Sequence, residues 1–118
     1  MFFLLPLHSQ NELGIRNKLS IYIMIAFITG ASSGIGAACA MKFAQGGYDL
    51  ILNARNEERL QALKTDIETA FGRQVLLLPF DVRDRQAARQ AVESLPADWQ
   101  YIDVLINNAG LALGLDKE

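Results

Sequence analysis

A glycine-rich turn, Thr29-Gly30-Ala31-Ser32-Ser33-Gly34-Ile35-Gly36, separates the apolar run Ile25–Ile28 from a helical stretch between Ile35 and about Gln45. Gly30 permits a sharp exit from the strand, Gly34 lets the backbone approach a pyrophosphate, and Gly36 allows close packing of helix on sheet. The spacing is not that of a P-loop, because no Gly-Lys-Ser/Thr follows. The turn therefore predicts a nucleotide site at the start of the helix. The alternative is an ordinary turn capped by Ser32 or Ser33.

Further apolar runs alternate with amphipathic segments after this turn. The runs are Leu50–Leu52, Val75–Leu78 and Val104–Ile106. One intervening segment repeats apolar residues every three or four positions and ends near Gly72. A second follows a capping residue, Asp84, carries an apolar stripe through Leu95, and is broken by Pro96. Such alternation is typical of a parallel sheet covered by helices, so we predict an α/β fold with a doubly wound parallel sheet.

The residue that follows the second strand of such a sheet selects the cofactor. A carboxylate there accepts hydrogen bonds from a ribose 2′-hydroxyl, whereas arginine pairs with a 2′-phosphate. This chain has Asn53-Ala54-Arg55-Asn56, with no carboxylate at the first two positions. We therefore predict that Arg55 binds the 2′-phosphate of NADP, with Asn56 beside it in the cofactor site. The alternative is a solvated Arg55 that pairs with Glu57 or Glu58.

The composition argues against several other classes of function. The 118 residues carry 11 basic and 13 acidic side chains, so the net charge of −2 leaves no surplus for binding nucleic acid. The single cysteine, Cys39, cannot form an internal disulfide, which fits a reducing, cytoplasmic compartment, and we expect it to fill the core. The apolar runs fall well below the roughly 18 residues needed to cross a bilayer, so no membrane span is expected.

Residues 1–23 precede the alternating pattern. They open with an apolar stretch, Met1–Leu7, and then turn polar without a helical or strand period. No basic residue precedes the apolar stretch, as it would in a secretory signal. We expect an extension that is disordered or lies upstream of a true start at Met24, and a nucleotide-binding part over residues 24–118. His8, the only histidine, lies in the extension, so we expect no histidine-based catalytic or metal site.

Three motifs in this order resemble those of the short-chain dehydrogenase/reductase family. They are the glycine turn of residues 29–36, the acidic pair Asp81-Val82 after the third strand, and Asn107-Asn108-Ala109-Gly110 after the fourth. The resemblance covers residues 24–118. Within the family, Ser94–Trp99 and Asn107–Gly114 are most similar to NADP-dependent 3-hydroxy acid dehydrogenases that act on serine and allo-threonine type substrates.

The resemblance implies a Rossmann-type sheet, incomplete here with strands in the order 3-2-1-4, and NADP as the cofactor. It implies that Asp81 accepts a hydrogen bond from the adenine amino group and that the Val82 backbone shapes the adenine pocket. It also implies that Asn107 and Asn108 contact the ribose and hold neighbouring strands. An alternative role for Asp81 is to cap the following helix. The predicted cofactor-binding residues are Gly30, Ser32, Ser33, Gly34, Ile35, Gly36, Arg55, Asn56, Asp81, Val82, Asn107, Asn108, Ala109 and Gly110.

The family's chemistry implies hydride transfer between NADP(H) and a small hydroxy acid or another alcohol or carbonyl, through a serine and a Tyr-x-x-x-Lys pair. Four residues after Tyr22, Tyr48 and Tyr101 stand Ala26, Leu52 and Leu105, so no catalytic residue is assigned. We expect the N-terminal part of such an enzyme, inactive alone, which at full length is a homo-oligomer with a small-molecule substrate. The alternative is a non-catalytic NADP-binding module or a degenerate fragment.

The strand order carries an expectation about the sheet edge. With strands in the order 3-2-1-4, the fourth strand lies at the edge, although its apolar run is typical of a strand with neighbours on both sides. We therefore expect an unpaired backbone edge and an exposed apolar patch near Val104–Ile106.

Overall fold

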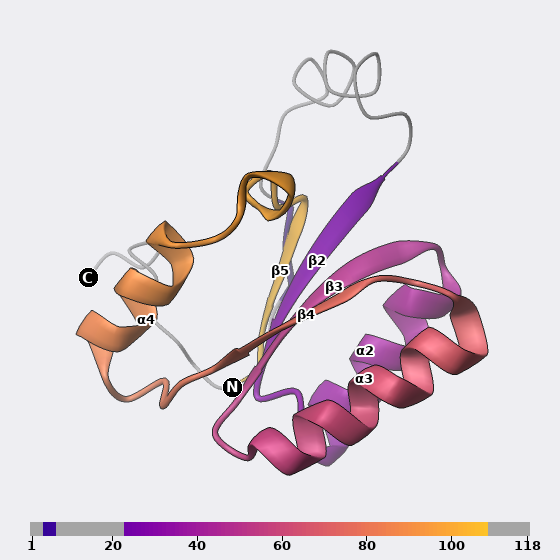
Figure 1. The fold of residues 1–118 in the computed structure, drawn as a ribbon, viewed down its shortest axis with the longest axis horizontal. Helices are drawn as coiled ribbons and strands as arrows, with labels where there is room; N and C mark the ends of the chain where they lie inside the picture. The colour runs from indigo at the N-terminus through magenta and orange to yellow at the C-terminus, as the bar shows by residue number, and fades with distance from the viewer. Residues whose placement is uncertain (1–3, 7–22, 109–118) are drawn as a thin grey trace.

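The computed structural model describes residues 4–6 and 23–108. Four parallel strands form the centre of the sheet: β2 (Met24–Thr29), β3 (Tyr48–Ala54), β4 (Val75–Pro79) and β5 (Val104–Asn107). They lie side by side in the order β5-β2-β3-β4, with a further strand, β1 (Leu4–Pro6), outside β5 (Figure 1). If the four parallel strands β2, β3, β4 and β5 are counted as strands 1 to 4, the order β4-β3-β2-β5 is 3-2-1-4. The predicted α/β class and strand order are therefore confirmed.

Helices cover both faces of the sheet. Helices α2 (Gly34–Gln45) and α3 (Glu57–Phe71) lie together on one face, and α4 (Arg85–Glu93) lies on the opposite side with the short 3-10 helix η1 (Ala97–Trp99) (Figure 1). No helix within residues 23–108 is long and apolar enough to cross a membrane. The alternation of short strands and longer helices therefore produces the layered arrangement that the sequence predicts.

The core forms two clusters, one on each face of the sheet. Along β2, Ala26 and Ile28 join the cluster beneath α2 and α3, whereas Ile25 and Phe27 join a second cluster that includes Leu95. Side chains of a strand alternate between faces, so burial on both sides requires an uninterrupted apolar run. This two-sided burial explains why the sequence predicted the central strands from their uninterrupted apolar runs.

Capping residues set the helix starts. The Asn56 side chain accepts a hydrogen bond of 3.1 Å from the Arg59 N–H at the start of α3, and the helix ends at Gly72, whose φ of 65° favours glycine. The Asp84 side chain accepts a hydrogen bond of 3.0 Å from the Ala87 N–H, so its predicted capping of α4 is confirmed.

Helix α4 is shorter than its apolar stripe. It ends at Glu93, although the stripe continues to Leu95, which is buried in the second core cluster. Proline disfavours helical geometry in the residue before it, so Leu95 leaves the helix ahead of Pro96. The stripe therefore predicted burial correctly and helix length incorrectly.

The expectation of an unpaired β5 edge was wrong. Strand β1 pairs antiparallel with β5, with Leu4 opposite Ile106 and Pro6 opposite Val104. Leu105 and Ile106 are each only 1% exposed, so they form no exposed apolar patch. Strand β1 pairs there because the unpaired N–H and C=O groups of an edge strand readily bond to another strand. The sequence did not predict β1, because three residues are too few to show a strand period. The domain boundary at residue 24 stays a prediction.

Candidate functional site

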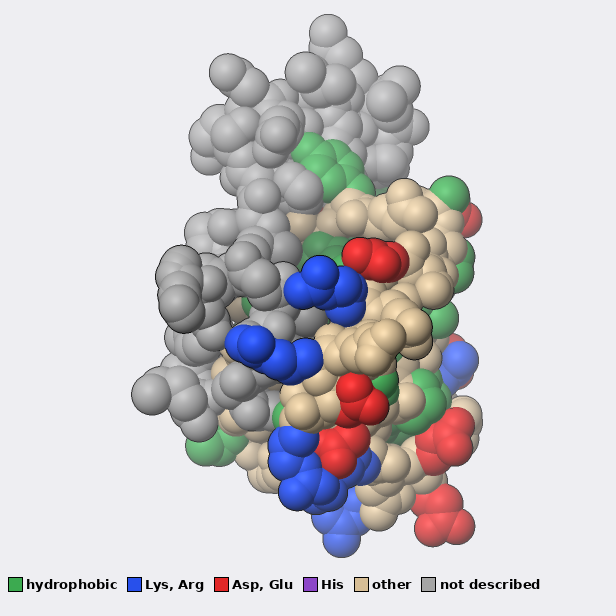
Figure 2. Space-filling model, turned by 90° about the vertical axis from the view of Figure 1, so that its left-hand side faces the viewer, with side chains coloured by type: hydrophobic (Ala, Val, Ile, Leu, Met, Phe, Trp, Pro, Cys, Tyr) green, Lys and Arg blue, Asp and Glu red, His purple; other side chains and the backbone are tan. Residues whose placement is uncertain are grey.

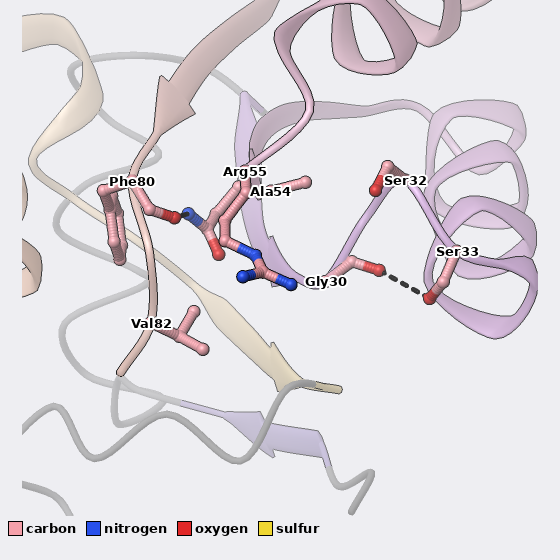
Figure 3. A pocket seen from close by; sticks show the side chains of 8 residues that line it. Gly30, Ser32, Ser33, Ala54, Arg55, Phe80 and Val82 are labelled. Atoms are coloured by element: carbon pink, nitrogen blue, oxygen red, sulfur yellow. Dashed lines mark hydrogen bonds between the residues drawn. The ribbon is translucent and has the colours of Figure 1, made fainter. Parts of the chain in front are cut away.

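The glycine turn joins the carboxyl end of β2 to α2. Gly30 has a φ of 63°, in the left-handed region that favours glycine. Ser33 is the N-cap residue of α2, but its side chain makes no capping bond; its Oγ instead donates a hydrogen bond of 3.0 Å to the Gly30 carbonyl (Figure 3). The first N–H groups of α2 are therefore not capped by Ser33, and such groups attract anions.

Two glycines of α2 differ in their surroundings. A Cβ on Gly36 would overlap the Gly30 carbonyl oxygen and lie 2.8 Å from the carbonyl carbon of Gly30 and 3.0 Å from the Ala31 Cα. A Cβ on Gly34 would have nothing within 4 Å. Gly36 is therefore required for the approach of the helix to the turn, whereas Gly34 faces open space.

The asparagines after β5 hold the turn from the other side. The Asn108 Nδ2 donates to the Gly30 carbonyl at 3.1 Å, and the Thr29 Oγ1 donates to the Asn107 Oδ1 at 3.2 Å. These bonds join the carboxyl ends of β2 and β5, in agreement with the strand-holding role that the resemblance implies. The predicted residues Ala109 and Gly110 lie outside the described residues.

A cavity of about 220 Å³ opens at the carboxyl ends of β2, β3 and β4 (Figure 3). It is lined by Gly30, Ser32, Ser33, Asn53, Ala54, Arg55, Phe80 and Val82. Three loops thus contribute its walls, and the predicted residues among them are Gly30, Ser32, Ser33, Arg55 and Val82. Ligands of doubly wound sheets bind outside the carboxyl ends of the strands, so this cavity is the candidate nucleotide site.

Arg55 lies at the mouth of the cavity. Its guanidinium extends between Val82 and Gly30 in Figure 3, and its side chain is 67% exposed. The Nη1 atom lies 3.9 Å from the Asp81 Oδ2, so its ion-pair partner within the described part of the chain is Asp81 rather than Glu57 or Glu58. An exposed pair at this distance is weak. The guanidinium can therefore turn toward a phosphate at little cost in free energy, because the contact with Asp81 that it gives up is weak.

Asp81 is held mainly by Arg83. The Arg83 N–H donates to the Asp81 Oδ1 at 2.9 Å, and the Arg83 Nη2 donates to the Oδ2 at 2.8 Å. These bonds lower the pKa of Asp81 to about 2, with the side-chain hydrogen bond as the largest cause and a smaller contribution from the charge of Arg55. The N-cap of α4 is Asp84, so Asp81 does not cap that helix. Asp81 is thus a fully ionised acceptor at neutral pH.

Charges of both signs lie next to one another on the face seen in Figure 2. Among the described residues, Asp81 pairs with both Arg83 and Arg55. Within residues 23–108, no three His, Cys, Asp or Glu side chains are grouped to hold a metal ion. Cys39 packs partly buried against the core beneath α2 and α3, and burial raises the pKa of its thiol.

Three further predicted residues, Ile35, Asn56 and Asp81, are absent from the lining of the cavity. Ile35 is 62% exposed in the first turn of α2, and the Asn56 side chain is engaged as the N-cap of α3. Asp81 lies between the lining residues Phe80 and Val82. The sequence did not mark three of the lining residues, Asn53, Ala54 and Phe80, as site residues, and Asn53 and Ala54 were considered only because neither is a carboxylate. A polar residue in an apolar strand was the available signal, since buried polar groups need partners.

Comparison with known proteins gives relatives for most of the chain. Residues 24–118 match the family model described as short chain dehydrogenase. The NADP-dependent 3-hydroxy acid dehydrogenase YdfG of Salmonella typhi is 48% identical over 93 residues, which are 79% of this chain and 36% of that protein. A probable NADP-dependent dehydrogenase of Dichelobacter nodosus is 52% identical over 91 residues, 77% of this chain and 82% of that protein. The chain thus spans about a third of the length of YdfG.

Solved structures show the same fold. An alcohol dehydrogenase from the archaeon Thermococcus sibiricus, complexed with 5-hydroxy-NADP, matches with a TM-score of 0.65 and 31% identity, over 69% of this chain and 34% of that chain. Serine dehydrogenase from Escherichia coli matches with a TM-score of 0.60 and 38% identity, over 67% of this chain and 35% of that chain. Each likeness covers about a third of the solved chain's length.

Proposed function

Because this chain belongs to the short-chain dehydrogenase family, we propose that the cavity at the carboxyl ends of β2, β3 and β4 binds NADP(H). We propose further that the chain is the cofactor-binding part of an oxidoreductase that acts on a small hydroxy acid or another alcohol or carbonyl. The nicotinamide supplies hydride chemistry when it is bound. The residues of this chain bind the nucleotide and fix its orientation.

The position of Arg55 carries the proposal for NADP rather than NAD. Its guanidinium stands at the mouth of the cavity, and the loop that bears it has Asn53 and Ala54 where a carboxylate would select a ribose 2′-hydroxyl. A guanidinium matches a phosphate with two parallel hydrogen bonds. Since Asp81 holds Arg55 only at 3.9 Å, the 2′-phosphate can replace that contact with a stronger one.

The other candidate residues serve the remaining parts of the nucleotide. The uncapped N–H groups at the start of α2, together with Gly34, lie where they can receive the pyrophosphate. Asp81, ionised and half-exposed, can accept a hydrogen bond from the adenine amino group beside Val82. Asn107 and Asn108 are proposed to contact the ribose, with Ala109 and Gly110 completing the site.

The substrate, the oligomeric state and the cellular location concern the whole protein, and each is a proposal. We propose a small hydroxy acid as substrate, in keeping with the name of the YdfG relatives, and a homo-oligomer in the cytoplasm without nucleic acid or membrane partners. We also propose that these 118 residues alone bind the cofactor without turnover, because none of the three tyrosines is followed by a lysine at the fourth position. A non-catalytic NADP-binding module is the second candidate, favoured by the same observation.

The test compares the dissociation constants of NADPH and NADH for the chain and for Arg55→Ala. A charge-assisted contact of about 1.5–3 kcal/mol predicts that NADPH binding weakens roughly ten- to a hundredfold while NADH binding is unchanged. Arg59→Ala, which removes an exposed arginine outside the lining, serves as the control and leaves both constants unchanged. An unchanged ratio in Arg55→Ala refutes the proposal. Turnover of NADPH with any carbonyl would refute the proposed inactivity of the chain alone.

A further inference from the structure

We infer that Asn53 is a positioning residue of the nucleotide site, whose buried amide fixes the loop after β4 against the glycine turn. The inference rests on the proposed binding of NADP(H) in the cavity, and it adds a residue that neither the motifs nor the family resemblance singled out. Asn53 lies near the carboxyl end of β3, lines the cavity and is fully buried.

The side chain of Asn53 holds the end of β4. Its Nδ2 donates to the Leu78 carbonyl at 2.9 Å and to the Phe80 carbonyl at 3.1 Å, and Figure 3 shows the second of these bonds. The two carbonyls stand on either side of Pro79, which has no N–H to give to the sheet and is the last residue of β4. The amide therefore fixes the chain where regular strand pairing stops and the loop with Asp81 and Val82 begins.

The backbone of Asn53 holds the opposite wall. The Ala31 N–H donates to the Asn53 carbonyl at 2.8 Å, next to Gly30 in the glycine turn. In Figure 3, Phe80 and Val82 lie on one side of the cavity and the glycine turn lies on the other. A single residue thus connects both walls, one through its side chain and one through its backbone. Removing the amide releases only the wall that carries Asp81 and Val82.

The unsatisfied oxygen of Asn53 argues for a role beyond stability. Both neighbours of the amide are carbonyl acceptors, so the NH₂ group must face them, and the buried Oδ1 has no hydrogen-bond partner in the described part of the chain. A buried acceptor without a partner costs about 1–3 kcal/mol. An aliphatic side chain in an otherwise apolar strand avoids that cost but cannot hold the Phe80 carbonyl. Local conflicts of this kind are expected at functional sites.

The opposite end of β3 offers a matched control. There the Asp49 carboxylate accepts hydrogen bonds from the Arg73 Nη2 at 2.8 Å and from the Gln74 N–H at 3.1 Å. Asp49 is 6% exposed, so this contact, like that of Asn53, is made by a buried side chain of β3 and connects it to the segment that begins β4. Arg73→Ala therefore removes a comparable connection between the same two strands, remote from the cavity.

The test uses the 118-residue chain with Asn53→Leu and Arg73→Ala. Asn53→Leu keeps a similar volume and removes the donor, so we expect the dissociation constants of NADPH and NADH to rise together, at least tenfold, with their ratio kept. Hydrogen exchange of the Arg83 and Asp84 amides should also accelerate at least tenfold without nucleotide, because these amides bond within the loop that Asn53 anchors. Arg73→Ala should lower the melting temperature but leave both constants within twofold of wild type.

The outcomes separate the two proposals. Constants within twofold of wild type in a folded Asn53→Leu chain overturn the positioning role, as does an equal rise in Arg73→Ala. If Asn53→Leu does not fold, Asn53→Ser, which keeps a hydroxyl donor, is measured in the same way and should give a smaller rise in both constants. A wild-type chain that binds neither nucleotide refutes the proposed function, and with it the role of Asn53.

Discussion

Gly36→Ala adds one methyl group where α2 comes closest to the glycine turn. That carbon would overlap the Gly30 carbonyl oxygen and meet two further backbone atoms at 2.8 and 3.0 Å. Because the obstacles are backbone rather than flexible side chains, the helix or the turn must move as a unit. Overpacking of this kind costs about 1–3 kcal/mol, and here we expect the upper part of that range.

The higher helix propensity of alanine offsets part of this cost in stability. Alanine is favoured over glycine inside a helix by about 0.5–1 kcal/mol. The net destabilisation of Gly36→Ala is therefore about 2 kcal/mol, which lowers the melting temperature by roughly 8–16 °C for a domain of this size. Thermal unfolding followed by circular dichroism measures it directly.

Gly34→Ala is the matched control two residues earlier. A methyl group there meets nothing within 4 Å, so the melting temperature should stay the same or rise slightly. The same methyl group stands where the pyrophosphate is proposed to approach the backbone, so NADPH binding should weaken. A Gly36→Ala chain as stable as wild type would refute the packing argument, and so would a Gly34→Ala chain that loses as much stability as Gly36→Ala.

Two further predictions concern Asp81 and β1. The pKa of Asp81 is lowered to about 2 from 3.8, so its ionisation adds stability that is complete above about pH 4 and is lost as the pH falls toward 2. Arg83→Ala should return that pKa toward 3.8, as a carboxyl NMR titration would show, and an unmoved pKa would contradict the role of Arg83. Deletion of residues 1–7 should leave the β5 edge unpaired and increase self-association, measured by light scattering. A truncated chain as monodisperse as the full chain would argue against that pairing.

Local signals in the sequence were sufficient for most of the fold. The runs at β2 and β3 are apolar on both faces because helices cover the sheet on both sides. Asp84 caps its helix through contacts within a few residues, which a sequence displays directly. The glycine turn could also be predicted from local sequence. The positive φ of Gly30 and the close packing at Gly36 restrict both positions to glycine.

Contacts between distant residues explain what the sequence did not reveal. The Asn53 amide bonds to carbonyls 25 and 27 residues away, and backbone carbonyls have no residue-specific signature. Strand β1 is three residues long and pairs with a strand some 100 residues later, so no period could mark it. The Arg83–Asp81 pair is the exception, because the two residues are only two positions apart; there it is the conformation of the loop, which the sequence does not display, that places the guanidinium on the carboxylate.

The most direct test of the nucleotide site is an NMR titration of the ¹⁵N-labelled chain with NADP⁺. A nucleotide bound in this cavity should cause saturable shifts concentrated on the amides of the cavity walls: Gly30, Ser32, Ser33, Arg55 and Val82. Amides of the far end of β3, such as Asp49, should move little because they lie at the opposite end of that strand. Shifts centred on that far end, or no saturable shifts at all, would contradict a nucleotide site at the carboxyl ends of the strands.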